Sequence, residues 1–181
     1  MDFLKGFDGD GLFPPENEAL YNLVLSSKPN VSFEVGTRRG GGSTYFISSA
    51  LFENKKGLLY TIECDPDCYT SAVNRFSGPL AHLKPYVLLH LGKSNEVYPH
   101  ALEKIEKIDV LFLDGEENDQ QTMTEYAMFK SKLISGSYLV CHDWHIGKMF
   151  KLRPIIESDT SWEKILVFTH TQTGFSIYKK K

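Results

Sequence analysis

Polar side chains follow the apolar runs of this sequence, at the points where buried strands would end. They include carboxylates, which accept hydrogen bonds from sugar hydroxyls or bind hard cations, and an imidazole, which can accept a proton. The residues concerned are Glu34, Glu63, Asp114, His142 and Asp143. A parallel α/β sheet binds its ligands beyond the carboxyl ends of its strands, so this placement indicates a ligand site.

The segment 31–44 has the most marked pattern of this kind. Its apolar residues suit a buried strand, while Gly36, Gly40 and Gly42 let the backbone turn sharply and approach a ligand. Residues 43–52 are apolar at helical spacing, so a helix should begin there with its free N–H groups directed at the ligand. Because the dinucleotide pattern GxGxxG is absent, the loop by itself identifies the cofactor only in part.

Two further features of the loop region have alternative interpretations. Glu63 lies near the offset from Gly36 at which an acid in such folds binds ribose hydroxyls, and the alternative is a solvated strand end. Arg38 and Arg39 suit a phosphate or a substrate carboxylate, but two arginines on a loop are also commonly solvated.

Apolar runs alternate with helical patterns and predict a mostly parallel sheet. Strands are expected at 31–35, 58–62, 85–91, 109–113, 137–141, 165–169 and 175–178, and helices at 14–27, 43–54, 65–76, 94–105 and 119–133. The last two strands are separated by HTQTG, which predicts an antiparallel hairpin. The expected fold class is therefore α/β, a doubly wound, Rossmann-like sheet of seven strands with that hairpin at its edge.

Length and composition restrict the class of protein. With 181 residues we expect a single domain, 1–181, in which an N-terminal arm and helix (1–30) precede the core (31–181). The net charge of −3 and the lack of a long basic run argue against a nucleic-acid partner. No apolar stretch suits a membrane span or a signal peptide, so a cytoplasmic location is expected, and the odd number of cysteines suits a reducing compartment. Core filling is expected for Cys64, Cys68 and Cys141 rather than metal or redox work, because a CxxxC pair without further cysteines or histidines nearby is a weak zinc signal.

Five segments at successive strand ends resemble those of the class I S-adenosylmethionine-dependent methyltransferases. They are SFEVGTRRGGGST, TIECDPD, LHLGKS, IDVLFLDG and GSYLVCHDW. Within that class the sequence is similar to the small branch of catechol and caffeoyl-CoA O-methyltransferases and of sugar- and antibiotic-cluster enzymes. The resemblance covers roughly residues 16–178 and implies methyl transfer to an oxygen of a small molecule or sugar.

The resemblance also implies which positions bind S-adenosylmethionine. Residues in the glycine loop surround the methionine part, an acid binds the ribose, and a later turn lies beside the adenine. The implied set is Glu34, Gly36, Thr37, Gly40, Gly42, Ser43, Glu63, Cys64, Gly92, Lys93, Ser94 and Asp114. This chain departs from the family by placing Gly42 where a serine is usual, with Ser43 one residue later.

The catalytic and metal positions depart further from the family. Catechol-type members hold a divalent cation with an acid after the fourth strand and an Asp-Asn pair after the fifth, which correspond here to Asp114, Asp143 and Trp144. His142 or Glu116 is then a candidate third ligand for Mg²⁺ or Mn²⁺, and metal dependence is left open.

The usual lysine or histidine after the fourth strand is absent, where Glu116 and Glu117 stand instead. The candidate catalytic residues are therefore Asp114, Glu117, His142 and Asp143, of which the last three are the candidate bases. Trp144 and Phe150 are candidates for the wall of an acceptor pocket.

Two other functions remain as alternatives. One is an NAD-dependent oxidoreductase on the same kind of sheet, against which the absent GxGxxG argues. The other is a regulatory protein that has kept the cofactor site and lost catalysis, which the missing base allows. The short loops leave the acceptor unspecified, and they suit either an open site or one completed by a second subunit in a homodimer.

Overall fold

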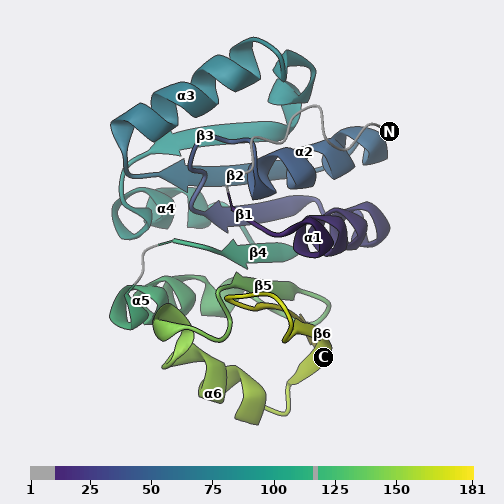
Figure 1. Cartoon of the computed structure of the whole chain (residues 1–181), viewed down its shortest axis with the longest axis vertical. Coiled ribbons are helices and arrows are strands. Elements are labelled where there is room, and N and C mark those ends of the chain that lie inside the picture. Colours follow the sequence, from purple (N-terminus) through teal and green to yellow (C-terminus); the bar gives the residue numbers. More distant parts are fainter. Residues whose placement is uncertain (1–10, 116–117) are drawn as a thin grey trace. The chain divides into compact units, whose positions relative to one another are not determined.

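The computed structural model describes residues 11–115 and 118–181, in which helices and strands alternate along the chain (Figure 1). The helices are α1 (Pro14–Ser27), α2 (Ser43–Asn54), α3 (Pro66–Ser77), α4 (Ser94–Leu102), α5 (Asp119–Phe129) and α6 (Leu152–Ser158). Short 3₁₀ helices are η1 (Ala81–Tyr86), η2 (Lys130–Lys132) and η3 (Gly147–Met149). The strands are β1 (Val31–Val35), β2 (Leu58–Glu63), β3 (Val87–Leu91), β4 (Val110–Leu113), β5 (Tyr138–His142), β6 (Trp162–Phe168) and β7 (Phe175–Lys180).

The chain divides into two compact units, Met1–Lys93 and Ser94–Lys181. In the first unit β1, β2 and β3 run parallel in the order β3-β2-β1. Helix α1 packs on α2, and α3 packs on β3. Fully buried apolar side chains from α1, β1, α2 and β2 form the core, among them Leu20, Val24, Phe33, Ile47, Leu51 and Leu59.

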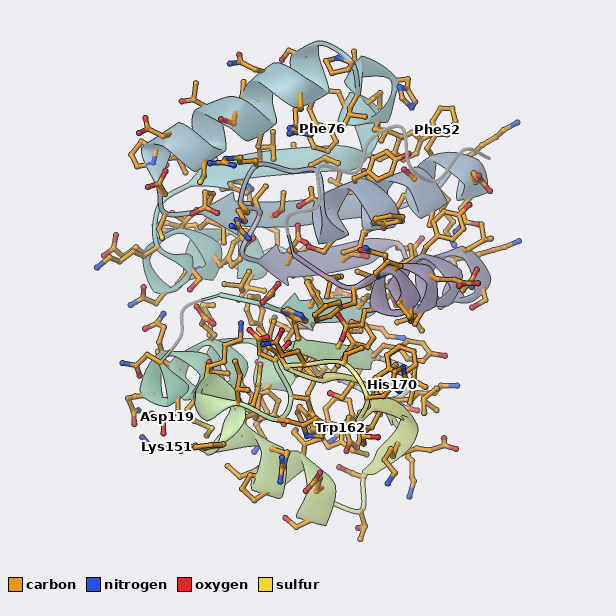
Figure 2. The ribbon with its side chains drawn as sticks, in the orientation of Figure 1. Phe52, Phe76, Asp119, Lys151, Trp162 and His170 are labelled. Carbon is orange, nitrogen blue, oxygen red and sulfur yellow. The ribbon has the colours of Figure 1, made fainter. Side chains whose placement is uncertain are left out.

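The second unit has the strand order β4-β5-β7-β6. Strand β5 runs parallel to β4 and antiparallel to β7, and β6 pairs antiparallel with β7 at the edge. All four residues of β4 are buried, as expected for a strand covered on both faces. At the edge, the Nζ atom of Lys180 lies 4.7 Å from the centre of the Trp162 ring, which is labelled in Figure 2.

The predicted fold class is confirmed, because the seven strands are mostly parallel and end in an antiparallel hairpin. Several predicted boundaries were wrong. Strand β3 begins at Val87 because Ala81–Tyr86 form a 3₁₀ helix, and Lys130–Lys132 tighten into another after α5. Helix α6 was not predicted, because seven residues are too few to show the helical spacing of apolar side chains.

Membrane spanning was also addressed by the structure. Among residues 11–115 and 118–181, every helix is too short or too polar to cross a bilayer. The candidate N-terminal arm, with the exception of its last residues, lies outside the described residues.

Candidate active site

The glycine-rich turn after β1 is fixed to the end of β2. The backbone N–H groups of Gly36 and Thr37 both donate to the carbonyl of Ile62, at 3.1 and 3.0 Å. Gly36 has a φ of 100°, a conformation that L side chains rarely adopt, and the chain then closes a tight turn from Thr37 to Gly40. The turn is therefore held in one conformation by β2 before any ligand binds.

Packing against α3 requires glycine at position 40. A Cβ built on this residue would lie 3.0 Å from a ring carbon of Phe76 and 3.3 Å from the Cβ of Ala72, both in α3. Its φ of +75° is a second reason for glycine. Figure 2 labels Phe76 on α3. Turn and helix thus pack directly on each other.

Glu34 lies beneath the turn with no exposed surface. Its Oε2 atom accepts hydrogen bonds from the hydroxyls of Thr44 and Thr61, both at 2.6 Å, and the Thr61 hydroxyl is also 2.5 Å from that of Thr37. The carboxylate therefore joins β1 to β2 and to the first turn of α2. This network explains why the two threonines and the acid occur together, whereas contact of Glu34 with a cofactor stays a prediction.

Glu63 is held at the end of β2 by backbone donors on both sides. Its Oε2 accepts a hydrogen bond from the N–H of Arg38 at 2.6 Å, and its Oε1 accepts one from the N–H of Asp65 at 2.9 Å. A carboxylate oxygen can accept two hydrogen bonds, so each oxygen keeps acceptor capacity for a hydroxyl. The acid is thus oriented in advance at the strand end, and its contact with a ribose stays a prediction.

The residues after Glu63 have mainly structural roles. Asp65 caps α3 by accepting hydrogen bonds from the N–H groups of Asp67 and Cys68, and the bond from Cys68 is the main cause that lowers the pKa of Asp65. Cys64 is exposed and Cys68 half-buried, so the prediction of core filling was wrong for both. It is correct for Cys141, where burial raises the thiol pKa to about 12.

The predicted turn beside the adenine is built around Gly92. Its N–H donates to the carbonyl of Glu63 at 2.8 Å, and its φ of 137° requires glycine. Lys93 is exposed. In the second unit, Ser94 begins α4, and its buried hydroxyl donates to Oε1 of Glu125 in α5 at 2.7 Å. This hydroxyl therefore joins the two helices.

In the second unit, the ends of β4 and β5 bring three predicted residues together. The register pairs Leu113 with Cys141, so the side chains that follow both strands meet. The Nδ1 atom of His142 lies 3.1 Å from Oδ1 of Asp114 and 3.3 Å from Oδ1 of Asp143. Ligand-type atoms of these three residues lie within 4.8 Å of one another. The sequence predicted this cluster.

Lys148 completes the cluster and was not predicted from the sequence. Its Nζ atom lies 2.7 Å from Oδ1 of Asp114 and 2.7 Å from Oδ2 of Asp143, and its side chain is only 3% exposed. The 3₁₀ helix η3 carries Lys148 back to the strand ends, beside the buried Met149. A signal existed, because a lysine within the apolar run IGKMF requires a partner if that run is buried.

In the ion pair of Asp143 and Lys148, the partners of each group together shift its pKa more than burial does. Burial acts to raise the pKa of Asp143, but hydrogen bonds from Lys148 and Thr173 and the charge of His142 bring it below its ordinary value. Burial acts to lower the pKa of Lys148, but Asp114 and Asp143 bring it above its ordinary value. Both groups are therefore charged at neutral pH.

A divalent cation does not fit this arrangement. Mg²⁺ and Mn²⁺ would bind carboxylate oxygens at about 2.0–2.2 Å, and the Lys148 ammonium already lies between Oδ1 of Asp114 and Oδ2 of Asp143. An added cation would bring two further positive charges against it. Metal binding by Asp114, His142 and Asp143 requires Lys148 to leave.

Comparison with known proteins identifies the family. Residues 33–144, more than half of the chain, match the family model described as a methyltransferase domain. The chain belongs to this methyltransferase family. The match includes every predicted strand-end residue from Glu34 to Asp143 and ends before Lys148. The prediction of a methyltransferase is thereby confirmed.

Solved structures share the fold of this methyltransferase. An O-methyltransferase from Bacillus cereus, in complex with SAH, is 18% identical with a TM-score of 0.79, and covers 97% of this chain and 84% of its own. The O-methyltransferase TomG from Streptomyces achromogenes, in complex with SAM, is 17% identical with a TM-score of 0.76, and the match covers 94% of this chain and 82% of that one. A putative caffeoyl-CoA O-methyltransferase from Staphylococcus aureus is 13% identical with a TM-score of 0.77, and the match covers 94% of this chain and 85% of that one. The sequence has no significant match among curated proteins.

The four remaining candidate residues have different outcomes. Trp144 is fully buried and packs on the ring of Tyr178 at 5.4 Å between centres, so its prediction as a pocket wall was wrong. Phe150 is 65% exposed, and its role in the wall of an acceptor pocket stays a prediction. Glu116 and the candidate base Glu117 lie outside the described residues.

Proposed function

We propose that this methyltransferase uses S-adenosylmethionine to methylate an oxygen of a small molecule or sugar. The observation that carries the proposal is Glu63, whose carboxylate is oriented by the N–H groups of Arg38 and Asp65 at the end of β2. The glycine-rich turn leads directly into the twelve-residue helix α2, whose first residue Ser43 has no side-chain cap before it. The N-terminus of such a helix favours a carboxylate, such as that of the cofactor's methionine part.

The reaction is an in-line displacement at the methyl carbon. A lone pair of the acceptor oxygen forms the new C–O bond while the C–S bond breaks, and the sulfonium becomes the neutral thioether S-adenosylhomocysteine. The hydroxyl proton passes to a base of the protein. Positioning of the two reactants supplies much of the rate in a step of this kind.

We assign the base role to His142 among the described candidates. Its Nδ1 faces Oδ1 of Asp114 at 3.1 Å, an arrangement that holds the imidazole with Nδ1 protonated and Nε2 as the proton acceptor. Nε2 lies 3.4 Å from the Thr173 hydroxyl. Asp143 is a weaker base because its contacts with Lys148 and Thr173 lower its pKa. In His142→Gln we expect slower methyl transfer with unchanged cofactor binding.

A thermal-shift experiment with S-adenosylmethionine, S-adenosylhomocysteine and NAD tests the proposal. A ligand at one hundred times its Kd stabilises the folded state by about 2.7 kcal/mol, so binding of either sulfur compound should raise the melting temperature clearly. A response to NAD alone would instead favour an oxidoreductase. No response to either sulfur compound would refute the proposal. Turnover of a hydroxylated acceptor would exclude a purely regulatory role.

Glu63→Gln shows whether the site is the predicted one. It should weaken S-adenosylhomocysteine binding roughly tenfold or more, because a hydrogen bond to a charged group contributes about 1.5–3 kcal/mol. Asp67→Asn is the matched control, since it removes a negative charge from the exposed first turn of α3 nearby. If both variants bound S-adenosylhomocysteine with the same Kd, Glu63 would not be part of the cofactor site.

The partners of the methyltransferase follow from the same proposal. We expect a small-molecule acceptor rather than a nucleic acid, given the net charge of −3. A cytoplasmic location and a homodimer stay predictions, which fractionation and light scattering would test.

A further inference from the structure

Lys148 occupies the position that the sequence analysis assigned to a metal ion. Its ammonium lies 2.7 Å from one oxygen of Asp114 and 2.7 Å from one oxygen of Asp143. These are the two acids that follow β4 and β5. The side chain is 3% exposed, so this is a buried charge and not a surface ion pair.

The cluster requires a cation. Asp114 and Asp143 place two carboxylates around one point, and like charges at such distances oppose each other's ionisation unless a positive charge lies between them. His142 reaches both acids through a single nitrogen, at 3.1 and 3.3 Å. Lys148 instead contacts each acid at 2.7 Å with a separate N–H donor available for each. The lysine therefore supplies the charge at the centre of the cluster.

Lys148 is also fixed in place by its local structure. The N–H of Ile146 donates to the carbonyl of Asp143, and the N–H of Met149 donates to the carbonyl of Ile146, both at 3.0 Å. Met149 and Leu152 are buried at 1% and 0% exposure and anchor the segment on either side. Removal of the ammonium from the two acids would thus disrupt this packing or leave a buried charge unpaired, which is costly.

We propose that Lys148 is a built-in replacement for the divalent cation, so that this methyltransferase needs no metal. The inference rests on the proposed function for the reaction that the charge serves. One consequence concerns the acceptor: two neighbouring hydroxyls that chelate a metal are not required. An acceptor with a single reactive hydroxyl, placed by hydrogen bonds, is sufficient.

Titration with Mn²⁺, followed by electron paramagnetic resonance of the free ion, tests the proposal on the purified full chain. Wild type should show no saturable uptake. Lys148→Ala should bind one Mn²⁺ per chain, with a Kd at least about tenfold below the highest Mn²⁺ concentration at which wild type takes up none, because the two acids and His142 are then available as ligands. The additional change Asp143→Asn should remove this binding. Lys151→Ala, three residues away on the exposed surface, is the matched control and should behave as wild type.

Two outcomes would overturn the proposal. The first is saturable Mn²⁺ binding by wild type that Asp143→Asn abolishes, because the metal then binds with Lys148 present. The second is a folded Lys148→Ala that takes up no more Mn²⁺ than wild type. If Lys148→Ala does not fold, Lys148→Gln replaces it, and the wild-type titration remains decisive by itself. None of these measurements requires S-adenosylmethionine, so failure here is distinct from failure in the thermal-shift experiment.

Discussion

The two units each bury a carboxylate at a strand end, and they stabilise it by different means. In the first unit Glu34 accepts hydrogen bonds from the neutral hydroxyls of Thr44 and Thr61. In the second unit Asp143 contacts the charged Lys148 at 2.7 Å. Neutral donors fix the geometry of the carboxylate, whereas an ammonium also compensates the negative charge of the carboxylate that it contacts. The second arrangement thus places a positive charge of the protein itself beside the acids after β4 and β5.

Lys148→Met should have the largest effect on stability. The substitution leaves two carboxylates without their shared cation, and loss of one partner from a buried ion pair costs about 3–5 kcal/mol. Urea unfolding at pH 7 measures the change. A loss of unfolding free energy below about 1 kcal/mol would mean that the pair contributes no more than a surface ion pair. It would contradict the view that a charged partner stabilises the carboxylate of the second unit.

The pH dependence of stability should reveal the same pair. The pKa of Asp143 is lowered on folding, so its contribution is complete above its ordinary pKa of 3.8 and is lost as the pH falls through the lower, folded value. The difference in unfolding free energy between wild type and Asp143→Asn should therefore be larger at pH 7 than at pH 3. Asparagine tolerates the φ of 56° at this position, so backbone strain does not obscure the result. A difference that is constant with pH would contradict the assignment.

Thr61→Val should have an intermediate effect. It removes one of the hydroxyls that donate to Glu34 while keeping the shape of the side chain, and an unsatisfied buried group costs about 1–3 kcal/mol. Thr70→Val, on the exposed face of α3, is the control and should change stability by less than about 0.5 kcal/mol. Equal effects in urea unfolding would show that the Glu34 network contributes little.

Lys151→Met should have the smallest effect. Figure 2 labels Lys151 and its partner Asp119, whose charged atoms lie 3.0 Å apart, with side chains 48% and 33% exposed. Exposed ion pairs contribute about 0.2–1 kcal/mol, so urea unfolding should detect little change. The comparison with Lys148→Met then isolates burial, since the two lysines lie three residues apart and have similar partner distances. Similar losses in both variants would contradict the role given to burial.

Sequence patterns predicted most of the fold, including the turn after β1 and the acid at the end of β2. Apolar runs with β-branched residues predicted the strands, and the glycines predicted the turn after β1, because both signals are local in the chain. Boundaries failed where short-range geometry decides, as at the 3₁₀ helix Ala81–Tyr86 before β3. The packing of Gly40 against Phe76 and Ala72 of α3 could not be predicted from the loop, because it joins segments far apart in the chain.

The sequence by itself determined that the methyltransferase places acids after β4 and β5, and that a metal was one way to use them. Only the tertiary structure decided which cation satisfies them. Lys148 lies 34 residues from Asp114 along the chain, and no spacing rule connects the two. The 3₁₀ helix at Gly147–Met149 brings them within 2.7 Å. Burial then makes this contact strong, because the low-dielectric interior favours a paired charge over a free one.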